Sequence, residues 1–288
     1  MRRLLLAVMM LGAVSGARAA DLPDFLRGSY SPPAPRVNWE GWYVGGQIGY
    51  TSSNIDLTNA PLTQTNFLLR NSVIQAPVAQ LGLFSAEHAQ AYGFGAFVGR
   101  NYQWDDIVYG LEANYIFLNN LSASAQSQLA RRFDNPGGLK PPAGHIDRFD
   151  VTLTGAASLQ IKDVTTFRGR VGWATGNFLP YAFGGLAIGR LAVARSVTVL
   201  ANEFDVFDGV GSGGTPIHTE TLISSQMLSQ AEVRGNNYTA GYTFGLGTEM
   251  LLFGNVFARV EWEYVKFLSV KDITSDMNSA RIGIGYRF

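Results

Sequence analysis

The residue types that most often carry chemistry are scarce in this chain of 288 residues. It contains no cysteine, which excludes thiol chemistry and a disulfide framework. The three histidines, His88, His145 and His218, fall in three different segments that we expect to be long loops. Three imidazoles could converge on haem or on a metal ion. Because no fixed spacing links them, we expect solvated side chains.

A second candidate for chemistry is the acidic stretch NEFDVFDG, which contains Glu203, Asp205 and Asp208. Carboxylates are the ligands that Ca²⁺ prefers, but this spacing does not match a calcium-binding loop. We expect these side chains to be solvated as well. With no nucleophile and base at a recognisable spacing, the sequence predicts no enzyme, no cofactor and no metal site.

The charged residues with a regular spacing are of another kind, because they alternate with apolar residues along extended segments. This set consists of Glu112, Arg168, Arg170, Glu249, Arg259, Glu261, Glu263, Arg281 and Arg287. Alternation places them on one face of β-strands. Five arginines and four glutamates enclosed together should pair, since an unpaired buried charge costs several kcal/mol. The chemistry predicted for them is an ionic core inside a barrel.

The strands that would position this core are visible as eight alternating segments. They span residues 41–50, 91–104, 108–117, 158–173, 179–197, 237–250, 255–264 and 280–288. Long connections of about 51–90, 119–157, 198–236 and 267–278 alternate with tight turns at Asp105-Asp106, Gly176-Asn177 and Phe253-Gly254. This alternation of long and short connections is typical of an up-and-down barrel whose loops share one rim.

The two faces of the strands decide which kind of barrel this is. In a soluble carrier the apolar face points inward, around a ligand. Here one face carries glycines and charged residues, while the other is rich in Trp, Tyr, Phe and Val, and only 15% of the chain is charged. An apolar surface of that size suits lipid. The sequence therefore predicts an all-β fold, an eight-stranded antiparallel up-and-down transmembrane β-barrel with long extracellular loops.

The ends of the chain agree with export and membrane insertion. Residues 1–19 combine two arginines, an apolar run and a small-residue pattern, as signal peptides do. We expect a Pro-rich periplasmic segment over 20–40 and the barrel over 41–288. Removal of Arg2, Arg3 and Arg18 with the leader leaves a small acidic excess. That balance argues against nucleic-acid binding.

Several of these segments also carry a family resemblance. ADLPDFLRGS after the leader, WEGWYVGGQIGY, FRGRVGWA, LPYAFGGLAIG and the terminal IGIGYRF resemble the small outer-membrane β-barrel family of alphaproteobacteria. This family comprises surface antigens and porin-family proteins similar to the membrane domain of OmpA. The terminal aromatic residues, Tyr286 and Phe288, resemble the signal that the outer-membrane insertion machinery reads. The resemblance covers the strands and leaves out the long loops.

The expected function is therefore that of a structural component of the bacterial outer membrane and a surface-exposed scaffold for interaction or antigenicity. The alternatives are a narrow porin-like channel for small solutes and binding of haem or metal by the loops. The expected partners are outer-membrane lipid and lipopolysaccharide, the insertion machinery, and an external ligand or host surface that contacts the loops.

Overall fold

The computed structural model of the chain describes residues 37–211 and 213–288. The expected signal peptide, 1–19, and most of the expected Pro-rich segment, 20–40, lie outside the described residues. In the described part of the chain, no helix is long and apolar enough to cross a membrane.

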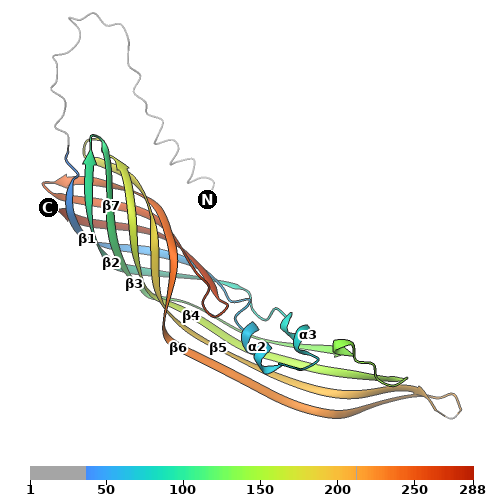
Figure 1. The fold of residues 1–288 in the computed structure, drawn as a ribbon. Coiled ribbons are helices and arrows are strands. Elements are labelled where there is room, and N and C mark those ends of the chain that lie inside the picture. The colour runs from blue at the N-terminus through green and yellow to red at the C-terminus, as the bar shows by residue number, and fades with distance from the viewer. Residues whose placement is uncertain (1–36, 212) are drawn as a thin grey trace, which may run out of the picture. The chain divides into compact units, whose positions relative to one another are not determined.

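Eight antiparallel strands form a closed ring in chain order (Figure 1). They are β1 (Gly41–Asp56), β2 (Ala86–Trp104), β3 (Ile107–Asp134), β4 (His145–Trp173), β5 (Phe178–Val210), β6 (Pro216–Phe253), β7 (Val256–Phe267) and β8 (Thr274–Arg287). β1 pairs with β2 along one edge and with β8 along the other. The predicted fold class, an eight-stranded antiparallel up-and-down barrel, is confirmed.

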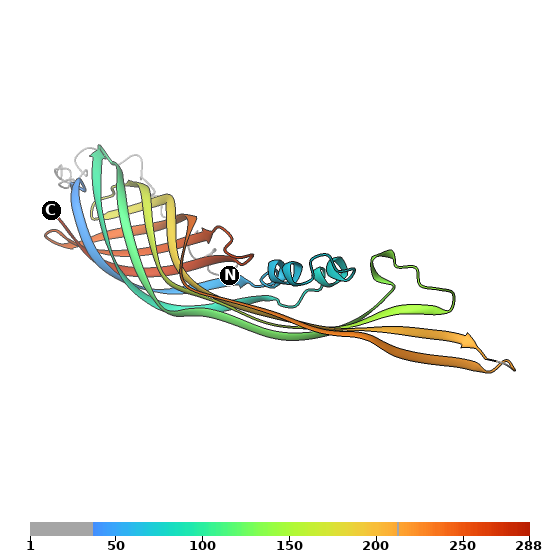
Figure 2. The ribbon, with the colours of Figure 1, turned by 60° about the horizontal axis from the view of Figure 1, so that its bottom comes forward.

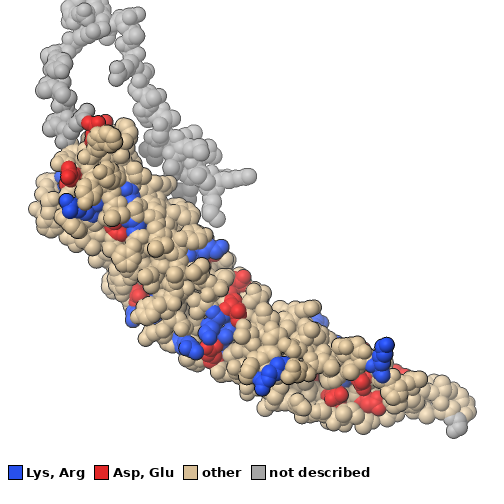
Figure 3. Space-filling view, in the orientation of Figure 1, with Lys and Arg blue, Asp and Glu red and all other residues tan. Residues whose placement is uncertain are grey.

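The barrel wall has an apolar outer face and a polar inner face. On β8, Arg281 is 2% exposed, whereas Ile282 and Ile284 are 55% and 63% exposed. The same alternation along the other strands leaves large apolar side chains exposed, among them Trp42, Phe94, Leu111, Trp173, Leu186, Leu246 and Trp262. Most of the face drawn in Figure 3 is accordingly uncharged. This is the arrangement of a barrel surrounded by lipid.

One rim of the barrel holds the short turns, the first residue of β1 and the last residue of β8. The turns span residues 105–106, 174–177 and 254–255. β1 begins at this rim, where Gly41 pairs with Asn101. β8 ends there, and the backbone N–H of Phe288 donates to the carbonyl of Trp42 at 2.8 Å. The last residue of the chain therefore helps to close the ring.

At the other rim the structure corrects the expected strand boundaries. The excursions expected over 119–157 and 198–236 are mostly strand, because β3 runs on to Asp134, β4 begins at His145, β5 runs on to Val210 and β6 begins at Pro216. The β5–β6 ladder extends from Phe178 opposite Met250 to Val210 opposite Pro216. Beyond the ring, these four strands continue side by side as an open sheet (Figures 1 and 2).

The sequence hides these extensions because small residues interrupt the alternation. In VTLTGAASLQI on β4, Val151, Leu153 and Leu159 are buried, and Thr, Ala, Ser and Gly occupy the positions between them. Two short helices after β1, α2 (Leu62–Leu68) and α3 (Gln75–Ala79), belong to the segment that covers one face of the open sheet. There Ile74 and Val78 share an apolar cluster with Val151, Leu153, Val197 and Val199.

Candidate functional site

The charged interior of the barrel is assembled from five strands by the alternation of their side chains. β3 contributes Glu112, β4 contributes Arg168 and Arg170, β6 contributes Glu249, β7 contributes Arg259, Glu261 and Glu263, and β8 contributes Arg281. All eight are buried. Several face each other directly across a ladder, as Glu112 does Arg168 and as Glu249 does Arg259. The register therefore sets opposite charges side by side.

Glu112 is the centre of this network. Its Oε1 accepts from Arg168 at 2.5 and 2.9 Å, and its Oε2 accepts from Arg259 Nη2 at 2.6 Å. The Tyr43 hydroxyl donates to Oε2 at 2.7 Å, and Arg170 approaches the same oxygen at 3.3 Å. Glu112 lies on β3 and Arg259 on β7, so this contact crosses the lumen. It ties opposite walls of the barrel together.

Two further carboxylates continue the network on β7. Glu261 accepts from Arg168 at 2.7 and 2.8 Å and from the Tyr181 hydroxyl at 2.6 Å. Glu263 accepts from Arg168 at 3.2 Å and from the Thr243 hydroxyl at 2.8 Å. The Arg168 guanidinium therefore serves three carboxylates, which leaves it no free face for a solute.

The remaining members complete the network on either side. Glu249 Oε1 accepts from both Arg170 and Arg259 at 2.8 Å. Arg281 forms an ion pair with Glu263 and donates to Asn114 Oδ1 at 3.3 Å. Four arginines thus meet four glutamates, and the formal charge of the network is zero.

Aromatic rings cover the guanidinium groups. Arg259 lies 3.7 Å from the centre of the Phe97 ring, Arg170 lies 3.9 Å from that of Tyr181, and Arg168 lies 4.0 Å from that of Phe183. These rings belong to an apolar cluster that also contains Trp39, Tyr43 and Phe257. Cations on aromatic faces in a site with little water are held more strongly than exposed ones. The rings and charges together fill this section of the interior.

Arg287, the ninth residue of the predicted ionic core, stands apart from the other eight. It is half-buried near the rim, and its guanidinium lies 5.3 Å from the centre of the Trp39 ring. Among the described residues it forms no ion pair. Sequence reasoning also left out the neutral partners Tyr43, Tyr181 and Thr243, which are buried at inward positions of β1, β5 and β6.

The three histidines do not come together. His88 lies on β2 opposite Asn54, His145 begins β4, and His218 lies on β6, so the expectation that all three lie in loops is wrong. His145 pairs with Phe207 and His218 with the adjacent residue Asp208, which places these two imidazoles on opposite faces of the open sheet.

The acidic stretch lies on β5, and two of its three acidic residues, Asp205 and Asp208, contact these histidines. His145 Nδ1 lies 2.8 Å from Asp205, and His218 Nδ1 lies 2.6 Å from Asp208. Hydrogen bonds to the carboxylates of Asp208 and then of Glu220 raise the pKa of His218. The pKa of Glu220 falls to about 2, mainly because its carboxylate accepts hydrogen bonds from Arg148. Nowhere in residues 37–211 and 213–288 do three or more His, Asp or Glu side chains gather as metal ligands would. These two contacts are hydrogen bonds between neighbouring strands, His145 on β4 with Asp205 on β5 and His218 on β6 with Asp208 on β5.

Comparison with known proteins places the barrel in a family. The family described as "Outer membrane protein beta-barrel domain" matches residues 5–288 of the chain. The chain is 25% identical over 268 residues to the 22 kDa outer membrane protein of Rhizobium leguminosarum bv. viciae, covering 90% of this chain and 82% of the relative. It is 24% identical over 255 residues to the 25 kDa outer-membrane immunogenic protein of Brucella ovis, covering 88% and 81%.

Among solved structures, the chain is similar to Neisserial surface protein A, with 12% identity and a TM-score of 0.36. That match covers 86% of this chain and 97% of the other.

Replacing Arg281 by Ala should destabilise the barrel more than replacing Ile282 by Ala. We expect a loss of about 3 kcal/mol for Arg281→Ala, the lower end of the range for a broken buried pair, because Glu263 keeps Arg168 and Thr243 as partners. Ile282 is exposed on the outer face, so its truncation leaves no sealed cavity. Urea unfolding of the two folded variants in lipid measures the difference. An equal or larger loss for Ile282→Ala would contradict the assigned faces of β8.

Proposed function

Because this chain belongs to the outer membrane protein β-barrel family, we propose that it acts in the bacterial outer membrane as an envelope component and as a scaffold for surface interaction. In this role the closed ring anchors the molecule in lipid. The open sheet formed by β3–β6 beyond the ring presents the recognition surface.

The open sheet is the observation that carries this proposal. Over residues 216–237, β6 pairs with β5 on one side, and its ladder with β7 begins only at Gly241. This stretch exposes Leu222, Ile223, Met227 and Val233. A sheet edge with exposed apolar side chains is a template for contact with another polypeptide. We expect an external ligand or a host surface to contact this edge. The Brucella ovis relative is named an immunogenic outer-membrane protein, which agrees with a surface exposed outside the cell.

The filled interior favours this role over transport. An eight-stranded barrel is just wide enough for side chains to fill. Here the network around Glu112 joins opposite walls, and the Tyr43 and Phe97 rings lie beside it. A solute would have to break several buried ion pairs in order to pass. We therefore propose that the lumen has a structural role. Conduction of solutes through the barrel would contradict this role.

The same contacts argue against an enzyme. Glu112, Glu249, Glu261 and Glu263 are each bound by guanidinium groups, and His145 and His218 are each bound by carboxylates. A general base needs a free lone pair within reach of a substrate proton. We propose that the chain performs no catalysis.

The orientation follows from the two rims. Transmembrane barrels have short periplasmic turns and longer external connections. We therefore propose that the turns at 105–106, 174–177 and 254–255 face the periplasm, and that the open sheet extends outside the cell beyond a leaflet containing lipopolysaccharide.

Single cysteines would test this orientation, because the chain has none of its own. Ser229→Cys is exposed on the open sheet and Asn255→Cys on a short turn. We expect a membrane-impermeant maleimide to label Ser229→Cys on intact cells, and to label Asn255→Cys only after the cells are broken. Labelling of Asn255→Cys on intact cells, without Ser229→Cys, would reverse the orientation and overturn the scaffold proposal.

Conductance would separate the scaffold from the channel. The purified, folded protein in a planar bilayer should show no stable current steps, because the charged network fills the section where Glu112 meets Arg259. A 16-stranded porin in the same bilayer provides the positive control. Reproducible steps that depend on this protein would instead support the narrow channel.

We also propose that Tyr286 and Phe288 form the signal for the insertion machinery. Their rings lie 5.1 Å apart in an edge-to-face contact, and both are exposed at the end of β8. Deleting Phe288 should lower the amount of folded protein in the outer membrane while the exported chain still reaches the periplasm. Fractionation with heat-modifiable gel mobility measures both. Phe253→Ala is a matched control, since Phe253 is exposed to a similar extent, 71% against 72%. Normal assembly without Phe288 would contradict the signal.

A further inference from the structure

Arg100 is a cation that faces outward from the apolar wall of the barrel. Arg100 is exposed on β2, four residues before the strand ends at Trp104. Its neighbours on the same face, Val98 and Tyr102, are exposed too. A charged side chain in contact with lipid is costly unless its head group reaches an anion or the polar interface.

Arg100 has aromatic neighbours and no ion pair within residues 37–211 and 213–288. Its guanidinium lies 4.9 Å from the centre of the Tyr102 ring and 5.5 Å from that of Trp42. Elsewhere on the wall, Arg190 donates to the Asp163 carboxylate at 2.8 Å. Arg100 thus keeps its hydrogen-bond donors available for an anion from outside the chain, and the planar fork of a guanidinium matches phosphate.

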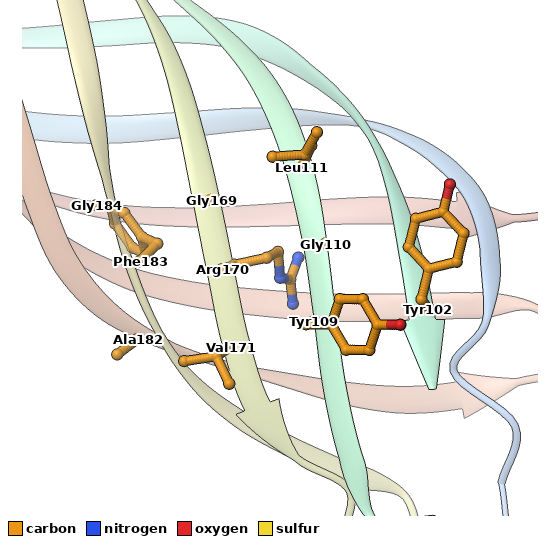
Figure 4. Close-up of a pocket in the computed structure, with 10 residues that line it drawn as sticks. All are labelled: Tyr102, Tyr109, Gly110, Leu111, Gly169, Arg170, Val171, Ala182, Phe183 and Gly184. Carbon is orange, nitrogen blue, oxygen red and sulfur yellow. The ribbon is translucent and has the colours of Figure 1, made fainter. Parts of the chain in front are cut away.

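An apolar groove of about 520 Å³ begins at Tyr102 and crosses the wall from β2 to β5 (Figure 4). Tyr102 and Tyr109 stack at its β2 end, with ring centres 5.6 Å apart. Leu111 and Val171 line it further along.

Two outward-facing glycines keep the groove open. A Cβ added at Gly169 would come no closer than 4.0 Å to another atom, and one at Gly184 no closer than 3.6 Å. The groove is therefore open because side chains are absent there. A hydrocarbon chain of the surrounding lipid matches its apolar lining.

We propose that Arg100, Tyr102 and this groove bind one phospholipid of the periplasmic leaflet. The phosphate accepts hydrogen bonds from the Arg100 guanidinium, Tyr102 packs against the glycerol region, and one acyl chain lies in the groove. The choice of leaflet rests on the proposed orientation, because the site is near the rim of short turns. The positive charge of Arg100 matches the phosphate of a phospholipid, and the apolar lining of the groove matches its acyl chain.

Native mass spectrometry of the delipidated, folded protein with added phosphatidylglycerol would test this proposal. Removing a charged hydrogen-bond donor should weaken binding about tenfold or more, so Arg100→Gln should lose the bound lipid. Gly184→Leu should lose it as well, because the new side chain fills the groove and its Cβ meets the Thr243 carbonyl only at a van der Waals distance of 3.6 Å. Two controls should retain it: Arg190→Gln, at an arginine paired with Asp163, and Gly46→Leu, at an outward glycine on β1 with similar free space.

Diacylglycerol and lipid A serve as the other probes, and heat-modifiable mobility checks that each variant is folded. Equal retention of diacylglycerol would overturn the role of the phosphate. Preferential retention of lipid A would overturn the choice of a phospholipid. Retention of phosphatidylglycerol by both Arg100→Gln and Gly184→Leu would show that the lipid binds unspecifically, and would overturn the proposed binding site. The cysteine labelling above reports on orientation by itself, so a failure there is distinguishable from a failure here.

Discussion

Every backbone N–H and C=O group within the hydrocarbon must find its partner inside the protein, and this requirement shapes the ring. A sheet meets it only by closing, because an open edge would leave a row of unpaired groups in lipid. The pairing of β1 with β8, from Tyr43 opposite Arg287 to Asp56 opposite Thr274, provides that closure. It also accounts for the backbone hydrogen bond that the N–H of Phe288 donates to the carbonyl of Trp42.

Closure with eight strands also determines what the interior must contain. The lumen is narrow, and half of all side chains in the wall point into it. Charges placed there lose water, so each needs several partners. The network satisfies this need with shared contacts, in which Arg168 bonds to three carboxylates and Glu112 to three arginines. Removing one partner therefore breaks contacts between several strands, and the interior network holds opposite walls of the barrel together.

The open sheet shows where the closure requirement ends. Beyond the ring, β3 to β6 continue without β1, β2, β7 and β8, and β6 keeps a long stretch paired on one side only. Unpaired backbone groups are tolerated there because water or a partner can satisfy them. Its stability comes instead from side chains: the segment with α2 and α3 packs against Val151 and Val199, and ion pairs such as Arg148 with Glu220 join the strands. One continuous sheet is thus an anchor in one part and an accessible surface in the other.

The sequence by itself determined the number of strands in the ring, their order and their two faces, because a period of two needs only neighbouring residues. Of the nine charges that it singled out, eight are buried in the structure and form ion pairs with one another. It did not show that residues 118–134, 145–157, 198–210 and 216–236 belong to strands, because small and polar residues blur the alternation there. Nor did it show which glutamate meets which arginine. Glu112 and Arg259 are 147 residues apart and on strands that are not neighbours. Their contact depends on the tilt and closure of the whole ring. The same geometry leaves Arg287 at the rim beside Trp39, since only the tertiary structure decides how far along the barrel axis each inward side chain lies.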